Sequence, residues 1–209
     1  MGEGAGFYGL LIVAVLLIGG AGWYFWCQYK TTQHQRHLHK VVGNLGVEFL
    51  RDVVLPDGVE GLAFIDYLLL VPNGVIVLDT HNIEGHLFGG ESVDQWSQVV
   101  NNRTYKFNNP LYLNETRCQA VSWNINNSLQ GLDAAADSQN KILVQGWLAF
   151  SNAGNFPKGI PQHVSMIDDL KNNLADLLRN QQSVSDGLRH VWKDLHSLSI
   201  TTRAENPQR

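Results

Sequence analysis

Cysteine is scarce in this chain, and charge is missing from one long stretch of it. The 209 residues include two cysteines, Cys27 and Cys118, which are too few and too differently placed for a disulfide framework. Asp, Glu, Lys, Arg and His are all absent between Glu3 and Lys30, and the net charge is −4. The lack of a basic surplus argues against a strongly basic nucleic-acid-binding surface.

The uncharged stretch predicts one transmembrane helix over residues 7–27. At ~1.5 Å per residue this segment would span ~30 Å, the thickness of a bilayer core. A cleaved signal peptide is disfavoured, because Met1–Tyr8 has no basic region and no small-residue cleavage site follows the apolar run. The run ends in aromatic residues that are typical of the headgroup level: Trp23, Tyr24, Phe25, Trp26 and Tyr29.

Basic residues follow the apolar run and predict the orientation of the chain. Lys30, Arg36 and Lys40 lie within residues 28–40, which we interpret as a juxtamembrane linker. Cytoplasmic loops next to membrane helices carry an excess of Lys and Arg. We therefore expect a single-pass protein whose C-terminal domain lies on the cytoplasmic side.

The remaining sequence alternates helical and strand patterns, with no internal repeat and no second domain boundary. The apolar spacing predicts helices over residues 41–55, 110–130, 166–178 and 184–198. Apolar and β-branched runs predict strands over residues 62–71, 75–78, 86–88, 103–107 and 141–150. These elements indicate one α/β domain over residues 41–180, with a mixed sheet flanked by helices, and a C-terminal helix and tail over residues 181–209.

The clearest local signal is a hairpin around Pro72-Asn73-Gly74. A turn centred on Asn73-Gly74 would place Asp66 opposite His81 and Leu68 opposite Asp79. Because side chains alternate between faces along a strand, all four would then share one face. A slip of one residue in this register would separate them.

Two carboxylates and an imidazole on one face of apolar strands are costly to bury unless they are paired or bind a metal. Mg²⁺ or Mn²⁺ would suit Asp66 and Asp79, because both cations prefer oxygen ligands. Such a cation could orient water and stabilise charge on a phosphoryl oxygen, while His81 helps to activate the water. The alternative is a cross-strand ion pair between Asp66 and His81, with Asp79 solvated at the strand end.

The segment Phe64–Gly85, FIDYLLLVPNGVIVLDTHNIEG, resembles the central signature of the NERD, or nuclease-related, domain. A weaker likeness extends over residues 41–178. It rests on Gly43, Gly46 and Glu48 for the first helix, on Trp96, and on the Asn-Pro segment Phe107-Asn108-Asn109-Pro110-Leu111.

The resemblance implies a restriction-endonuclease-like core that hydrolyses nucleic-acid phosphodiesters. In that family an Asp and an acidic-x-Lys pair on adjacent strands bind a divalent metal. By position, Asp66 and Asp79 would be the metal ligands, Glu48 would be the acid of the first helix, and His81 stands where the family usually has lysine. Asp79 also replaces the usual glutamate, and Leu113 stands where a glutamine is expected.

These departures leave more than one interpretation open. The first is a metal-dependent nuclease acting on DNA or RNA beside a bacterial inner membrane. The second is a catalytically degenerate module that binds nucleic acid or a protein partner and uses the membrane helix for placement. A third is that the helices over residues 166–198 form an oligomerisation surface.

Overall fold

The computed structural model describes residues 36–130, 142–178 and 184–205 of the chain. It divides into two compact units, residues 1–42 and 43–209. In the first unit residues 36–42 are described and are helical, whereas the predicted transmembrane helix over residues 7–27 lies outside the described residues. Among the described residues, no helix is long and apolar enough to cross a membrane.

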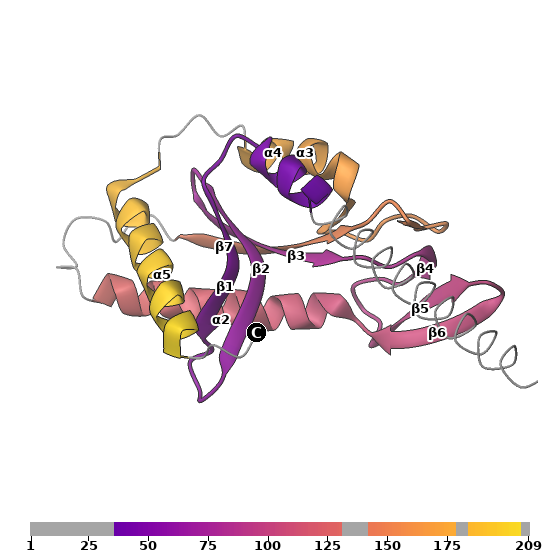
Figure 1. Cartoon of the computed structure of the whole chain (residues 1–209), viewed down its shortest axis with the longest axis horizontal. Helices are drawn as coiled ribbons and strands as arrows, with labels where there is room; N and C mark the ends of the chain where they lie inside the picture. The colour runs from indigo at the N-terminus through magenta and orange to yellow at the C-terminus, as the bar shows by residue number, and fades with distance from the viewer. Residues whose placement is uncertain (1–35, 131–141, 179–183, 206–209) are drawn as a thin grey trace, which may run out of the picture. The chain divides into compact units, whose positions relative to one another are not determined.

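Two β-sheets form the framework of the second unit (Figure 1). The first sheet has the order β1 (Phe49–Pro56), β2 (Leu62–Val71), β3 (Gly74–His81), β7 (Leu143–Phe150) and β9 (Val164–Met166). Neighbours from β1 to β3 are antiparallel, whereas β7 pairs in parallel with both β3 and β9, so the sheet is mixed. The second sheet has the order β6 (Arg103–Asn108), β5 (Gln95–Val100), β4 (Gly85–Phe88) and β8 (Gly154–Asn155).

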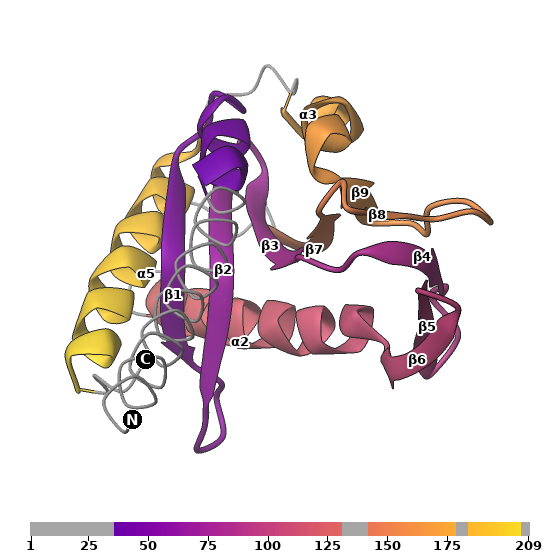
Figure 2. The ribbon, with the colours of Figure 1, turned by 45° about the vertical axis from the view of Figure 1, so that its right-hand side comes forward.

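Two long helices pack against the first sheet. The helix α2 (Pro110–Gln130) begins close after β6 and crosses the sheet towards β1, and α5 (Asp186–Glu205) lies beside β1 and α2 (Figure 2). Their apolar side chains share one core with β1, β2 and β3, which includes Val53, Leu68, Val77, Val121 and Val191. The short helices η1 (Ile167–Asp169), α3 (Leu170–Asn173) and α4 (Ala175–Leu178) follow β9. The predicted α/β architecture with sheets flanked by helices is thus confirmed.

A second core joins the two sheets. Trp96 of β5 is fully buried and stacks on Phe150 of β7 at 5.9 Å between ring centroids. Phe107 and Phe156 contact the same indole edge-on. Trp96 therefore has a packing role, and this core holds the second sheet against the end of β7.

The predicted helix over residues 41–55 is wrong, because the helix ends at residue 43 and β1 begins at Phe49. Gly46 adopts a φ of 78° and Asp52 a φ of 52°, neither of which fits a right-handed helix. At Asp52 the alternation of faces is interrupted, so Leu50 and Val53 both pack towards the same core. Their spacing of three residues resembled a helical period for this reason.

Several smaller elements also differ from the prediction. The predicted helix over residues 166–178 is divided into η1, α3 and α4, and the C-terminal helix continues to Glu205. The strands β5, β8 and β9 were not predicted, because half of the residues of β5 are polar and the other two strands are very short. The hairpin, β4, β6, α2 and β7 lie where the sequence predicts them.

The hairpin is confirmed but its predicted register is wrong. Val71 pairs with Gly74 and Leu68 with Val77, so the turn is Pro72-Asn73. A Cβ atom on Gly74 would lie 1.9 Å from the carbonyl oxygen of Leu143 in β7. This glycine therefore permits β7 to approach β3, rather than belonging to the turn as the sequence suggested.

Candidate functional site

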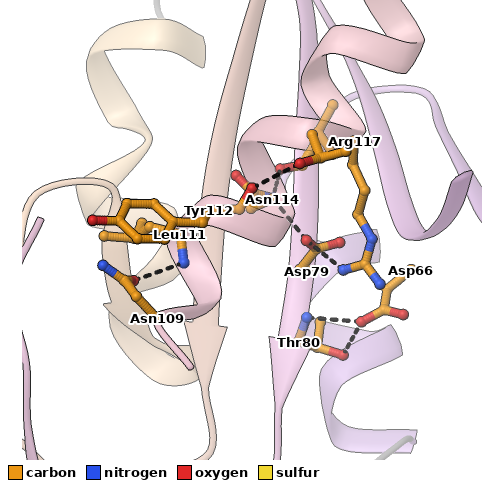
Figure 3. A network of polar contacts seen from close by, with 10 residues as sticks. Asp66, Asp79, Thr80, Asn109, Leu111, Tyr112, Asn114 and Arg117 are labelled. Carbon is orange, nitrogen blue, oxygen red and sulfur yellow. Dashed lines mark hydrogen bonds and ion pairs between the residues drawn. The ribbon is translucent and has the colours of Figure 1, made fainter. Parts of the chain in front are cut away.

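Asp66 and Asp79 lie close together where the pairing of β2 and β3 ends (Figure 3). The last ladder pair is Tyr67 with Leu78, so the next positions along the two strands are Asp66 and Asp79. Beyond that pair the Asp66 side chain replaces the backbone ladder. Its Oδ2 atom accepts hydrogen bonds from the backbone N–H and the hydroxyl of Thr80, both at 2.8 Å. These bonds hold the half-buried carboxylate of Asp66 against β3.

The Asp79 carboxylate is 1% exposed and is bound by two side chains of α2 (Figure 3). Its Oδ2 atom accepts a hydrogen bond from Asn114 Nδ2 at 2.9 Å and forms an ion pair with Arg117 Nη1 at 2.6 Å. Burial raises the pKa of Asp79, although Arg117 and Asn114 oppose this shift. The alternative in which Asp79 is solvated at the strand end is therefore wrong.

Asn109 fixes the start of α2 and so positions Asn114 and Arg117. Its Oδ1 atom accepts the backbone N–H of Leu111 at 3.0 Å, as an N-cap residue does (Figure 3). Its Nδ2 atom donates to the carbonyl oxygens of Gly90 and Val93 in the loop before β5. The Asn-Pro segment thus connects the second sheet to the helix that carries the site.

His81 lies two residues after Asp79 and stacks on Phe150, with 4.9 Å between ring centroids. Burial lowers the pKa of His81, and this effect outweighs the attraction of Asp66, which would raise it. The imidazole is therefore neutral at pH 7.

Three buried polar atoms at this end of β3 and β7 have no hydrogen-bond partner: Asp79 Oδ1, His81 Nε2 and Ser151 Oγ. Ser151 follows β7 and donates its backbone N–H to the carbonyl oxygen of His81 at 2.9 Å. Buried polar atoms are hydrogen-bonded in the large majority of cases. A group of unpartnered atoms at the ends of adjacent strands indicates a place where a polar ligand binds.

Glu48 is not brought to these residues. Its backbone oxygen accepts the N–H of Leu70, which is four residues, or ~13 Å along a strand, from Asp66. Its side chain is 62% exposed and lies 3.9 Å from Arg189 of α5. The structure therefore unites Asp66, Asp79 and His81, and leaves Glu48 outside their site.

Sequence reasoning missed Asn114 and Arg117 as site residues. Both lie on the sheet-facing side of α2, one turn apart, where a buried amide and an arginine interrupt an apolar pattern. That interruption was the available signal. Leu113, where the resemblance leads one to expect glutamine, is 53% exposed, and the amide that reaches the site belongs to the following residue.

The donor atoms fit a hydrated Mg²⁺ or Mn²⁺ ion. Asp79 Oδ1 is buried and unpartnered, and Asp66 supplies a second carboxylate close by. Within the described residues no group of three or more His, Cys, Asp and Glu side chains could hold a metal. Mg²⁺ is often bound by one or two carboxylates with water as its other ligands, so two carboxylates suffice. Asp66 and Asp79 would hold the ion.

Burial disfavours thiolate chemistry at the nearby cysteine. Burial raises the pKa of Cys118 to about 12, so its side chain is a thiol rather than a nucleophilic thiolate at neutral pH.

A mixed sheet that carries Asp66 and Asp79 where the pairing of β2 and β3 ends, with His81 as the last residue of β3, defines an α/β protein with an acidic polar site. Residues 28–151, more than half of the chain, match the model of the nuclease-related domain, NERD. The chain belongs to this family.

A second comparison gives a relative of the chain. An uncharacterized protein of Bacillus anthracis is 32% identical over 72 residues, which span 34% of each of the two chains. The chain thus covers about a third of the length of this relative. No solved structure matches the chain.

Proposed function

We propose that this NERD domain binds nucleic-acid phosphodiesters beside Asp66, Asp79 and His81 and hydrolyses them with a divalent cation, Mg²⁺ or Mn²⁺. The observation that carries the proposal is the unpartnered buried atom Asp79 Oδ1 next to the Asp66 carboxylate, with a second unpartnered atom, His81 Nε2, two residues further along β3. Family membership supports it, as does the restriction-endonuclease-like core that the resemblance implies.

Each residue has a defined task in this proposal. When bound, the cation would supply positive charge that activates water and stabilises the phosphoryl oxygens. Asp66 and Asp79 would bind this cation where the pairing of β2 and β3 ends. His81 is neutral, so its ring accepts a proton from the water whose oxygen attacks phosphorus. The bond from phosphorus to one sugar oxygen breaks, and that oxygen takes a proton from solvent.

The test is cleavage of labelled single- and double-stranded DNA and RNA by the full chain in detergent, with Mg²⁺, Mn²⁺ or a chelator. We expect cutting that depends on the cation and is lost in Asp79→Asn, which keeps the size of the side chain. The matched control is Glu48→Gln, which changes an exposed acid outside the site and should leave cutting intact. Cutting that persists in Asp79→Asn would contradict the proposal.

Binding without hydrolysis is the second candidate, and one observation favours it. Arg117 already neutralises Asp79 at 2.6 Å, and His81 brings no charge to the site. A domain that binds nucleic acid in the same assay, but cuts none of the substrates with either cation, would select this function.

We further propose that residues 7–27 tether the domain to a bacterial membrane, with the domain on the cytoplasmic side. The uncharged apolar run and the basic residues that follow it support this placement.

A further inference from the structure

Arg117 reaches the site from a different element than the other charged groups. It extends from α2 to β3, where its Nη1 atom lies 2.6 Å from Asp79 Oδ2 (Figure 3). Arg117 thus brings a charged group from α2 to a strand residue that we assign to the reaction.

The charges of the site show why such a group is needed. Asp66 and Asp79 are both acidic, so the strands bring negative charge to a site that would bind an anionic phosphodiester. Arg117 is the cation that forms an ion pair at the site, within the part of the chain that the structure describes.

The geometry leaves Arg117 able to bind a second anion. Its contact with Asp79 joins Nη1 to a single carboxylate oxygen, and 18% of its side chain is exposed. A guanidinium group has five N–H donors in a planar fork, which matches two oxygens of a phosphate. One edge can therefore remain on Asp79 while another edge faces a ligand from solvent.

We propose that Arg117 binds the substrate phosphate, and so supplies positive charge to the site from α2. This inference rests on the proposed function, because it assigns a further substrate-contacting residue to the same site.

The experiment measures binding of a single-stranded oligonucleotide to the full chain in detergent, with chelator present so that no cutting occurs, over a series of salt concentrations. Arg117→Gln should weaken binding about tenfold. It should also make the negative slope of the logarithm of the association constant against log salt shallower by about 0.7, the value for one lost contact to a single-strand phosphate. A residue that only holds Asp79 in place would not change that slope. The matched control is Arg189→Gln, an arginine paired with Glu48 outside the site, whose slope should equal that of the unaltered chain.

A second measurement avoids any substitution, because loss of Arg117 also removes a partner of buried Asp79. The unaltered chain is treated with phenylglyoxal, which modifies arginine, and the sites are read by mass spectrometry. Bound oligonucleotide should protect Arg117 and leave Arg189 reactive. Binding without protection of Arg117, or with an unchanged salt slope in folded Arg117→Gln, would overturn this inference and leave the proposed function standing. No binding by the unaltered chain would overturn both.

Discussion

Arg117 and Asp79 form a charge pair that is largely removed from water, and its stability consequences can be measured. Arg117→Met leaves the carboxylate of Asp79 with one neutral partner, Asn114. Breaking a buried pair by removing one partner costs about 3–5 kcal/mol, so we expect a decrease of this size in the free energy of unfolding. Adding Asp79→Asn should recover most of the loss, since an amide needs no countercharge.

Denaturant unfolding of the single and double variants checks this expectation. Arg189→Met is the control, because Arg189 and Glu48 are both more than half exposed and 3.9 Å apart. Removing such a surface pair changes stability by about 0.5 kcal/mol or less. Equal effects of the two arginine substitutions would show that the Asp79 pair is not effectively buried.

His81 gives the second expectation at the scale of single residues, and it concerns pH. Burial lowers its pKa in the folded chain, so below the ordinary value of about 6.5 the unfolded chain binds a proton that the folded chain does not. The stabilising contribution of the neutral His81 imidazole is therefore present above pH 6.5, and it is lost as the pH falls through the folded-state pKa. Unfolding from about pH 7.5 to about pH 5.5, with chelator, should show a loss of stability that is smaller in His81→Phe.

The phenylalanine substitution retains a ring to stack on Phe150 and removes only the titration. His196→Phe on the exposed side of α5 is its control and should preserve the pH slope of the unaltered chain. A His81→Phe profile that coincides with that of the unaltered chain would show that His81 does not titrate differently on folding.

At the scale of elements, the contact between α2 and β7 depends on Gly146. A Cβ atom there would lie 1.8 Å from Asn114 Oδ1 and 3.1 Å from Cys118 Sγ. Asn114 cannot move freely, because its amide donates to both Asp79 and the carbonyl oxygen of Val77. We expect Gly146→Ala to lower stability by about 1–3 kcal/mol, as overpacking does, and to reduce cleavage by displacing Asn114.

Thermal unfolding and the cleavage assay together test the role of Gly146. Gly90→Ala is the matched control, because a Cβ atom on Gly90 would meet nothing within 4 Å. If Gly146→Ala retained the stability and activity of the Gly90 control, α2 would not be held at the distance that the structure shows.

The elements also explain how far the sequence could predict the structure. The sequence predicted β2, β3, β7 and α2 correctly. Their signals, strong apolar runs and an Asn-Pro helix start, come from neighbouring residues. The helix predicted over residues 41–55 failed because one distorted residue, Asp52, altered the period of β1. The prediction of the hairpin register failed because Gly74 packs against β7, a strand about 70 residues away in the chain.

The same distinction applies to the site. Asp66, Asp79 and His81 were predicted from the alternation of two adjacent strands, and a register error of two positions preserved their shared face. Arg117 and Asn114 approach from a helix whose placement depends on tertiary packing, so spacing along the hairpin contained no information about them. Glu48 was expected in the site as the acid of a predicted first helix. In the structure it is instead the residue before β1.

At the scale of the whole molecule, the proposed anchor over residues 7–27 would confine the site to a membrane surface. The expectation is that the full chain remains in the membrane fraction after alkaline carbonate extraction. Val15→Arg with Leu16→Arg should release it, since each arginine near the centre of a membrane helix costs about 2.5–3.5 kcal/mol on insertion scales. The same change at Thr31 and Thr32, beyond the apolar run, should leave the chain in the membrane. Release of the unaltered chain by carbonate would mean that nucleic acid is met in solution, and the basic residues after the run would then need a different explanation.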